Sequence, residues 1–375
     1  MRRILILGLL VLCVLALPLV AACGGGEETE TTAEPTETTA APTETTAAPT
    51  ETTAATGETI KLTWAEMNPP NIPTAVGTQA YADHIVEASG GRVEIDVHGG
   101  GSLYGNTEVF DGVRMGGADA GSYVIESGDG FHYNILFNLP FINYPGMKEA
   151  VEIYWTLYEE FPQFEQEFTD LGLAYTAHYQ NPPVHLHFHE ANKVVRTPED
   201  IKGMSLLALE GYMAEWFSLL GAAPENPSYN DLFSMIDTKA ADGFIQHCLF
   251  MAGFELVKQF TSHTILGTGG ANMMGLGMLW NKDTLNGLPA DIQQLILDSG
   301  REVYLDAILE ANAGDVEKWE TAIAESGNLV TTLTPEEIKP WQDVLQPVYQ
   351  SWIDGAPDPA VAQSMFDRLM ELTGN

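Results

Sequence analysis

Three histidines, His185, His187 and His189, alternate with large apolar residues near the middle of the chain. Alternate side chains of a β-strand share one face, so the three imidazoles would project together with their Cα atoms about 6.5–7 Å apart. Three imidazoles can bind zinc, and Glu190 or His178 could supply a fourth ligand. The same imidazoles could instead form hydrogen bonds to a small molecule, or lie on a solvated or structural face.

Neighbouring positions on one strand face usually diverge too far to bind a single tetrahedral ion, which weakens the metal hypothesis. The preceding Asn181-Pro182-Pro183 indicates a segment that crosses between two parts of the fold. We therefore predict no resident metal. Hydrogen bonding to a ligand and a structural face remain the two open interpretations of the histidines.

The rest of the chain carries no recognisable catalytic motif. It lacks His-Glu-x-x-His, Gly-x-Ser-x-Gly, a Walker loop and Gly-x-Gly-x-x-Gly. Five glycines, at Gly267, Gly269, Gly270, Gly275 and Gly277, have the wrong spacing to bind phosphate, and we interpret them as a hinge or turn beside a strand. The sequence thus predicts a protein that is not an enzyme.

The charge balance excludes one class of partner. The 375 residues include 52 acidic and 16 basic side chains, which gives a formal net charge of −36. Phosphate binding needs clustered lysine and arginine, so nucleic acid is excluded and an anionic membrane surface is a poor target. The hydrophobic content of 45% suffices for a packed core, and the length suggests two domains or one large one.

Residues 1–22 have the order of a secretory signal, because Arg2 and Arg3 precede an apolar run that ends in small residues. The following Val20-Ala21-Ala22-Cys23 resembles a bacterial lipobox, in which the cysteine is lipidated and becomes the mature N-terminus. An ordinary cleavage site beside an accidental cysteine is the alternative. We predict an extracytoplasmic protein that is attached through lipid on Cys23 to the outer face of the cell membrane.

Residues 23–58 form a predicted tether between the lipid and the folded part. A seven-residue unit, Thr-Glu-Thr-Thr-Ala-Ala followed by Pro or Thr, begins at Thr36, Thr43 and Thr50. The unit contains no large apolar residue, so it cannot form a coiled-coil seam or bury enough surface to fold. Cys248 is the one cysteine left in the folded part, so no intrachain disulfide is expected.

Residues 59–375 alternate predicted strands and helices. Strands are expected near 60–64, 93–97, 171–177, 184–188, 204–209 and 241–245. Helices are expected at 74–89, 106–115, 147–157, 212–220 and 231–239, and a long one begins at Pro289. Repeated strand–helix units predict an α/β fold with a largely parallel sheet, and the length favours two lobes.

An ordered set of motifs resembles the solute-binding receptors of tripartite ATP-independent periplasmic (TRAP) transporters, dicarboxylate-receptor type. The similarity spans about residues 60–330. Its motifs include Asn68-Pro69-Pro70, Gly90-Gly91-Arg92-Val93-Glu94-Ile95, Glu108-Val109-Phe110-Asp111-Gly112-Val113-Arg114, Leu139-Pro140-Phe141, Thr197-Pro198-Glu199-Asp200-Ile201-Lys202-Gly203-Met204 and Trp280-Asn281-Lys282.

The resemblance implies a two-lobed, periplasmic-binding-protein-like fold of type II, with mixed, mostly parallel sheets and a long helix spanning both lobes. Lobe I would comprise about residues 59–182 plus part of 271–375, and lobe II about 183–270 plus the remainder. It also implies capture of a small organic solute and its delivery to integral-membrane permease subunits. Two alternatives remain: a substrate-binding lipoprotein of an ATP-driven importer, and a secreted metal-dependent hydrolase that uses the histidines.

One feature that the resemblance implies is missing. Family members place an arginine just after the Lys-Gly-Met segment, where it binds a substrate carboxylate through two parallel hydrogen bonds. Here that stretch is Ser205-Leu206-Leu207-Ala208-Leu209, no arginine occurs between Arg196 and Arg301, and a second expected arginine near residues 185–187 is also absent. The ligand is therefore expected to be neutral, cationic or apolar. Alternatively, an acid binds through His185 and His187, through main-chain donors or through a bound cation, with no other cofactor.

We expect the ligand to contact side chains that follow strand ends or flank the missing arginine. The residues chosen on this basis are Trp64, Glu66, Asn68, Tyr123, Glu126, His185, His187, Leu207, Tyr212, Asn230, Gln246 and His247. For each of them, a place on the surface or in the packed core is the alternative.

Overall fold

The computed structural model describes residues 58–374 apart from positions 107, 126–128, 210 and 228. The predicted signal, the lipidation at Cys23 and all but the last residue of the predicted tether lie outside these residues. Within the described part, no helix is both long enough and apolar enough to cross a membrane.

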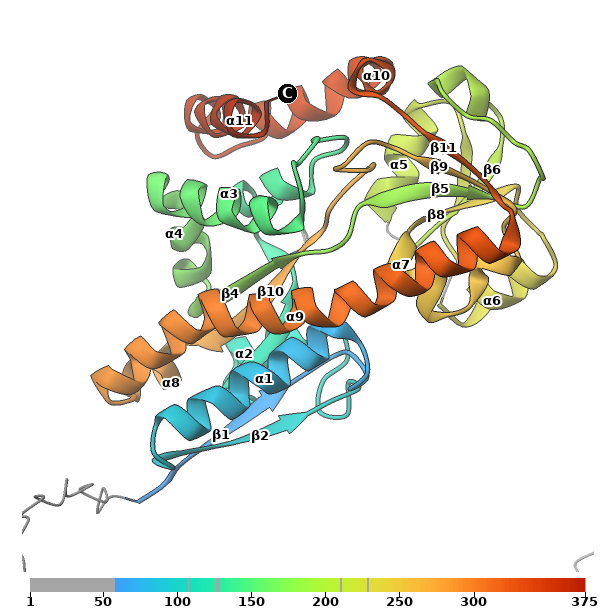
Figure 1. Ribbon diagram of the computed structural model, residues 1–375. Helices are drawn as coiled ribbons and strands as arrows, with labels where there is room; N and C mark the ends of the chain where they lie inside the picture. The colour runs from blue at the N-terminus through green and yellow to red at the C-terminus, as the bar shows by residue number, and fades with distance from the viewer. Residues whose placement is uncertain (1–57, 107, 126–128, 210, 228, 375) are drawn as a thin grey trace, which may run out of the picture. The chain divides into compact units, whose positions relative to one another are not determined.

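The first of two sheets has five strands in the order β2-β1-β3-β10-β4 (Figure 1). Their bounds are β1 Ile60–Ala65, β2 Val93–His98, β3 Ala120–Val124, β4 Leu173–Gln180 and β10 Gly275–Asn281. Strand β1 runs parallel to β2 and β3, whereas β10 runs antiparallel to β3 and β4. The sheet is therefore mixed.

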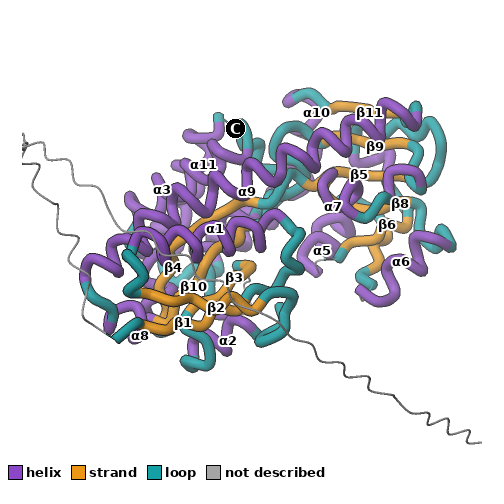
Figure 2. Tube along the Cα trace, turned by 60° about the horizontal axis from the view of Figure 1, so that its bottom comes forward, coloured by secondary structure: helices purple, strands orange, loops and turns teal. Residues whose placement is uncertain are grey.

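The second sheet has six strands in the order β11-β9-β5-β8-β6-β7. Their bounds are β5 Val184–Phe188, β6 Ser205–Ala208, β7 Ala223–Glu225, β8 Gly243–His247, β9 Ser262–Ile265 and β11 Leu329–Thr332. Strand β5 is antiparallel to both β8 and β9, and the remaining pairs are parallel. Figure 2 shows the strands of the two sheets as separate groups.

The same chain path explains why each sheet contains one antiparallel strand, β5 or β10. Strand β5 follows the segment 181–183, which leaves the first sheet, and β10 follows the segment 266–274, which leaves the second. Each of these strands starts at the edge of its sheet that faces the connecting segment, where the neighbouring strands have their other ends. It is therefore antiparallel to its neighbours. The prediction of an α/β fold with two mixed sheets is confirmed.

Helices pack on both sheets, and α1, α2, α3, α5 and α6 agree with the five predicted ranges between residues 74 and 239 to within three residues. Those beside the first sheet are α1 Pro73–Ala88, α2 Val109–Arg114, η2 Tyr133–Asn138, α3 Met147–Glu160, α4 Gln163–Asp170 and α8 Lys282–Gly287. Those beside the second are η3 Pro198–Ile201, α5 Gly211–Leu219, α6 Tyr229–Asp237, α7 Cys248–Gly253 and η4 Leu256–Lys258. At η3, Thr197 and Asp200 form a reciprocal capping box, which explains why the chain turns at this point.

Helix α9, Ala290–Ser326, has 37 residues and is therefore about 55 Å long. It contacts α1 and β4 towards its start and α7 and η4 towards its end (Figure 1). Ile296 and Tyr304 belong to an apolar core beside the first sheet, whereas Trp319 belongs to a core beside the second. The prediction that one long helix spans both lobes is confirmed.

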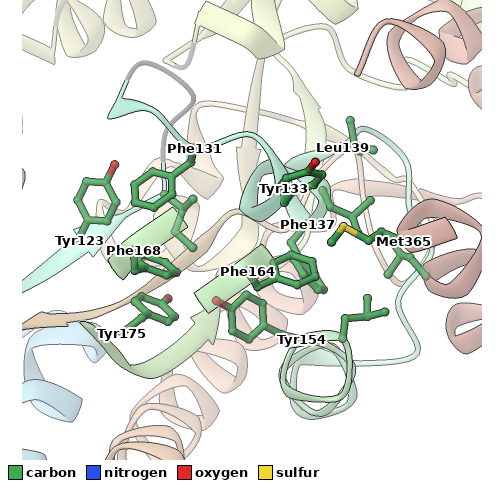
Figure 3. Packing of buried hydrophobic residues seen from close by; sticks show 14 of the residues in the cluster. Tyr123, Phe131, Tyr133, Phe137, Leu139, Tyr154, Phe164, Phe168, Tyr175 and Met365 are labelled. Atoms are coloured by element: carbon green, nitrogen blue, oxygen red, sulfur yellow. The ribbon is translucent and has the colours of Figure 1, made fainter. Parts of the chain in front are cut away.

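Helix α10, Pro335–Asp354, is also shared between the lobes, and the sequence analysis did not predict it. Trp341 packs in a core beside the second sheet, and Trp352 packs in the large aromatic core beside the first. The helix contains two internal prolines, Pro340 and Pro347. The final helix, α11 Pro359–Thr373, completes the aromatic core, part of which Figure 3 shows.

Candidate functional site

The strand ends define one candidate region on each sheet. In the first sheet, the carboxyl ends of β1, β2, β3 and β4 and the amino end of β10 lie at one edge. In the second, the carboxyl ends of β6, β8 and β9 and the amino end of β5 share an edge. The segments 181–183 and 266–274 connect these two edges. Ligands of open α/β sheets bind at such strand ends, so the site is sought there.

Glu66 follows β1 and is almost fully buried, with 1% of its surface exposed. Its Oε2 accepts a hydrogen bond from Thr78 Oγ1 at 2.6 Å, and its Oε1 accepts from the main-chain nitrogen of Asn68 at 2.7 Å. The amide of Asn68 also donates to Glu66 Oε1 at 3.1 Å and to Thr74 Oγ1 at 2.9 Å. Two predicted contact residues, Glu66 and Asn68, thus share one network.

Burial raises the pKa of the Glu66 carboxyl, while hydrogen bonds from Thr78, Asn68 and Ser122 oppose the increase. Desolvation disfavours the charged form of a carboxyl group, and donors stabilise it. Because both carboxylate oxygens already have protein partners, the network fixes the turn between β1 and α1. A role for Glu66 in ligand contact remains a prediction.

Two predicted contact residues lie inside apolar cores. Trp64 is fully buried and packs against Tyr81 and Trp280, with ring centroids 5.1 Å away in both cases. Leu207 is fully buried in a core that includes Phe244. These surroundings favour a packing role for both side chains in this conformation.

Tyr123, in β3, is buried against Phe110 and Phe131, and its hydroxyl donates to Asp129 Oδ2. Its body therefore belongs to the aromatic core, while its hydroxyl is bound to a carboxylate near the end of β3. Glu126, which was predicted to follow the same strand, lies outside the described residues.

The histidine stretch differs from the prediction of three imidazoles on one strand face. Strand β5 ends at Phe188, so His189 lies beyond it and its Nδ1 is 2.8 Å from the main-chain oxygen of Gln259. His185 and His187 do share a face, because they pair with Gln246 and Phe244 of β8. Among residues 58–374 as described, no group of three or more His, Cys, Asp or Glu side chains could hold a metal ion.

The buried His187 forms a hydrogen-bonded chain with His263. Its Nε2 lies 2.9 Å from the main-chain oxygen of Gln246, which can only accept, so Nε2 carries the proton. Its Nδ1 therefore accepts from His263 Nδ1 at 2.8 Å, and His263 Nε2 accepts from Asn328 Nδ2 at 3.1 Å. All four ring nitrogens have partners, and both rings are neutral.

Burial also keeps the other histidines of this sheet neutral. Burial, with a smaller effect of His247, lowers the pKa of His185 to about 3, and burial lowers the pKa of His247 to about 4. The main-chain nitrogen of Leu266 donates to His185 Nδ1 at 3.3 Å, and that of Phe250 donates to His247 Nδ1 at 3.1 Å, which caps α7. These rings therefore offer no positive charge to an anionic ligand near neutral pH.

Three further predicted residues have separate surroundings. Gln246 is buried, and its Oε1 accepts from the main-chain nitrogen of His247 at 2.9 Å. The hydroxyl of Tyr212, in α5, donates to Met274 Sδ at 3.2 Å and so links the second lobe to the segment 266–274. Asn230 lies in α6, and its side chain is outside the described part of the structure.

The arginines of the described chain all lie in ion pairs on the surface. The pairs are Arg92–Asp291, Arg114–Asp111, Arg196–Glu337, Arg301–Glu159 and Arg368–Glu160. The stretch in which the resemblance implies an arginine includes β6, which carries the buried Leu206, Leu207 and Ala208. The structure therefore supplies no arginine for binding a carboxylate at the strand ends.

A group of buried polar residues at the end of the first sheet was not among the predicted ligand contacts. Gln180 ends β4, and neither its Oε1 nor its Nε2 has a partner in the described structure. His178 Nε2 and Asn272 Oδ1 are likewise buried and unpartnered. The available signal was position, because Gln180 directly precedes Asn181-Pro182-Pro183.

A groove of about 840 Å³ lies between α7, η4 and the last third of α9. Glu255, Lys258, Glu317, Lys318 and Glu325 contribute charged groups to its wall. None of the predicted contact residues lines it, so it is distinct from the strand-end region.

Comparison with known sequences gives a family match over residues 64–354, to the model of bacterial extracellular solute-binding protein, family 7 (DctP). The C4-dicarboxylate-binding protein DctB of Bacillus subtilis is 23% identical over 314 residues, which cover 80% of this chain and 83% of that protein. The C4-dicarboxylate-binding periplasmic protein DctP of Vibrio cholerae is 24% identical over 285 residues, which cover 75% and 82%.

Solved structures share the fold at low identity. A TRAP periplasmic solute-binding protein from Desulfovibrio salexigens has a TM-score of 0.73 and 17% identity, over 84% of this chain and 96% of that one. DctP7 of Bordetella pertussis, a receptor binding pyroglutamic acid, has a TM-score of 0.67 and 20% identity, over 82% and 99%. A TRAP solute-binding protein from Rhodoferax ferrireducens with copurified benzoate has a TM-score of 0.69 and 18% identity, over 84% and 98%.

Proposed function

The chain belongs to bacterial extracellular solute-binding protein family 7, and from this premise we propose which solutes it captures and how it is held at the cell surface. As a member of this non-enzymatic family, it is an extracytoplasmic solute receptor of a TRAP transporter that binds small organic ligands. This membership sets aside the importer and hydrolase alternatives. Permease subunits are the proposed partner, and the lobe boundaries near residues 182 and 270 remain part of the proposal.

The proposed solute is neutral or cationic. The observation that carries this proposal is that the arginines of the described chain form surface ion pairs, while the stretch in which the resemblance implies an arginine, Ser205-Leu206-Leu207-Ala208-Leu209, contains none. Burying a carboxylate without a cationic partner is strongly unfavourable.

Two further observations support this choice. His185 and His187, the other candidates for binding an acid, are neutral because burial lowers the pKa of both rings. The formal charge of the whole chain, −36, also repels anions at long range and attracts cations.

A carboxylic acid bound through main-chain donors or through a cation is the second candidate. It is favoured by the relatives, since two of them are named for C4-dicarboxylate binding and two solved structures hold pyroglutamic acid or benzoate. Those ligands are properties of the relatives. In this chain an acid would need donors other than arginine.

Matched acid and amide pairs test the two candidates. Thermal unfolding of the purified protein would be followed with succinate and succinamide, benzoate and benzamide, and pyroglutamate and its amide. A ligand at 100 times its Kd adds about 2.7 kcal/mol to the free energy of unfolding, which shifts the melting temperature visibly. The proposal expects an amide to stabilise the protein more than its acid. A consistent preference for the acids would contradict it.

We also propose that Cys23 carries the lipid that anchors the receptor. The support is the order Val20-Ala21-Ala22-Cys23 behind an apolar run, followed by a segment rich in Thr, Glu, Ala and Pro. Replacement Cys23→Ser should move the protein from the membrane fraction to the soluble fraction and abolish labelling by an alkyne fatty acid. Cys13→Ser, within the apolar run, is the matched control and should retain both. Membrane attachment of Cys23→Ser would contradict the proposal.

A further inference from the structure

Two glycines of β10 lie opposite polar residues of β4. Gly275 pairs with Gln180, and Gly277 pairs with His178. Directly opposed residues of neighbouring strands point to the same face of a sheet. Because neither glycine has a side chain, the space above β10 is left to the side chains of its neighbours, on the face that carries the aromatic core.

The space above Gly277 is filled. A Cβ there would lie 2.0 Å from the hydroxyl oxygen of Tyr175 and 2.0 Å from the main-chain oxygen of Ala177. The Tyr175 hydroxyl is in turn 2.9 Å from His178 Nδ1, and the His178 ring stacks on Tyr154 with centroids 3.5 Å apart. Figure 3 shows Tyr154 and Tyr175 in this aromatic core. Gly277 is therefore required for packing.

The space above Gly275 is bounded differently. A Cβ there would lie 3.2 Å from His178 Cε1, 3.7 Å from Ile125 Cδ1 and 3.8 Å from Asn138 Oδ1, so no neighbour occupies the position itself. Asn138 holds this arrangement: its Oδ1 accepts from the Gly275 nitrogen at 3.0 Å, and its Nδ2 donates to the Ile125 oxygen at 2.8 Å.

Three residues around this position, Gln180, His178 and Asn272, carry polar atoms without partners. Gln180 and His178 are both fully buried, yet Gln180 Oε1, Gln180 Nε2 and His178 Nε2 have no hydrogen-bond partner in the part of the chain that the structure describes. Asn272 is 2% exposed, and its Nδ2 donates to the Asn138 main-chain oxygen at 2.9 Å, whereas its Oδ1 is unpartnered. Buried polar groups are nearly always hydrogen-bonded, so this concentration requires an explanation.

The cluster is uncharged and can both donate and accept. Gln180 Nε2 donates, and Gln180 Oε1 and Asn272 Oδ1 accept. Burial lowers the pKa of His178 far below its usual value, so its ring is neutral and Nε2 acts according to its tautomer. The cluster also lies where β4 ends and the chain leaves the first sheet, which is the edge at which a solute is expected.

We propose that Gln180, His178 and Asn272, gathered around Gly275, form a subsite for the uncharged end of the solute, namely a carboxamide or another group that both donates and accepts hydrogen bonds. This inference rests on the proposed function and deepens it, because it assigns the residues that form hydrogen bonds to a neutral polar group of the solute. A carboxamide matches Gln180, since each amide can donate to the oxygen of the other.

The subsite is tested with Gln180→Met, which keeps the length of the side chain and removes both polar atoms. The matched control is Gln259→Met in the second lobe, where Gln259 Oε1 is also buried and unpartnered. Binding of succinamide, benzamide and pyroglutamic amide, with the corresponding acids, would be measured by calorimetry on the purified full chain. Loss of a hydrogen-bonded pair to a buried ligand group should weaken amide binding about 10- to 100-fold in Gln180→Met and leave Gln259→Met unchanged.

The outcomes separate this inference from the proposed function. Equal amide binding by the wild type and Gln180→Met would overturn the subsite and leave the neutral-solute proposal intact. Binding of the acids but not the amides would overturn the neutral-solute proposal and the subsite together, and so would binding of none of the six compounds. If Gln180→Met did not fold, His178→Phe, which keeps the stacking on Tyr154, would be tested in its place with the same expectation.

Discussion

Two buried histidine clusters, one on each sheet, differ in how their hydrogen bonds are completed. In the second sheet, His187 and His263 bind each other, the main-chain oxygen of Gln246 and the amide of Asn328, so all four ring nitrogens have partners. In the first sheet, His178 Nε2 and both polar atoms of Gln180 have no partner within the described residues.

The difference indicates which cluster is structural and which is open to a ligand. A completed network of neutral groups stabilises the fold and leaves nothing to bind a solute. An incomplete one destabilises the empty protein and gains hydrogen bonds when a matching group arrives. Residue types alone do not separate the two, because both clusters consist of histidine and amide side chains.

The largest expected effect comes from the glycine at which the first cluster is tightly packed. Gly277→Ala would place a Cβ 2.0 Å from the Ala177 oxygen and the Tyr175 hydroxyl, so the free energy of unfolding should fall by about 3 kcal/mol or more. Urea unfolding followed by tryptophan fluorescence measures this. If the variant were as stable as the wild type, the strands around Gly277 would be able to shift and accommodate the added Cβ, which would contradict this prediction.

Breaking the completed cluster should give the next largest effect. His187→Leu leaves His263 Nδ1 buried without its partner and removes the hydrogen bond to the Gln246 main-chain oxygen, which should lower the free energy of unfolding by about 2–4 kcal/mol. The double variant His187→Leu/His263→Leu should lose less than the sum of the single variants, because their interaction is removed from both sides. Strictly additive losses in a urea titration would contradict the proposed pairing.

The completed cluster also predicts a pH dependence. Burial lowers the pKa of His187 well below its ordinary value and that of His263 to about 4, whereas in the unfolded chain both titrate near 6.5. Below pH 6.5 the unfolded state therefore binds protons that the folded state does not, so stability should fall as the pH decreases from about 6.5 towards 4. Each such group contributes up to about 1.4 kcal/mol per pH unit in this range.

Urea unfolding at several pH values between 4 and 7.5 measures this slope. His187→Leu/His263→Leu should flatten it, because both buried rings are removed. Burial raises the pKa of Glu66, so this group acts in the opposite sense: its contribution decreases as the pH rises above 4.5. A wild-type slope in the double variant would show that other groups dominate.

The smallest effect on stability is expected at the open cluster. Gln180→Met removes two polar atoms that have no partner, so the free energy of unfolding should change by no more than about 1 kcal/mol. Gly275→Ala should also be mild, because its Cβ meets no atom closer than 3.2 Å. If Gln180→Met lowered the free energy of unfolding by more than about 3 kcal/mol, Gln180 would be a residue that stabilises the fold, as His187 is.

Much of the fold could be predicted because it depends on local pattern. The helical periodicity after Pro289 predicted α9, and the alternation around Leu62 and Val93 predicted β1 and β2. The direction of β10 was not predictable, because its glycine-rich sequence weakens the strand pattern and its neighbours β3 and β4 are distant in sequence. Helix α10 was missed because its two internal prolines interrupt an otherwise helical pattern.

The site could be predicted only in outline. Position relative to the predicted strands drew attention to Glu66 and Gln246, and their contact with a ligand stays a prediction, because burial and partners are properties of the assembled structure. The sequence could not show that Trp64 and Leu207 face apolar cores, or that His187 finds its partner 76 residues away in His263. The sequence also gave no reason to connect Gln180 with Gly275, since that pairing depends on the register of β4 and β10, two adjacent antiparallel strands.

The internal proline Pro347 determines where helix α10 can bend. Pro347 lies between Leu345, which packs beside the second sheet, and Tyr349, which packs beside the first. Proline has no N–H, so the carbonyl of Asp343 already lacks its helical partner at this point. A rotation of one core relative to the other would therefore bend α10 at Pro347 without breaking a main-chain hydrogen bond. Each half of the helix would keep its packing contacts with its own core.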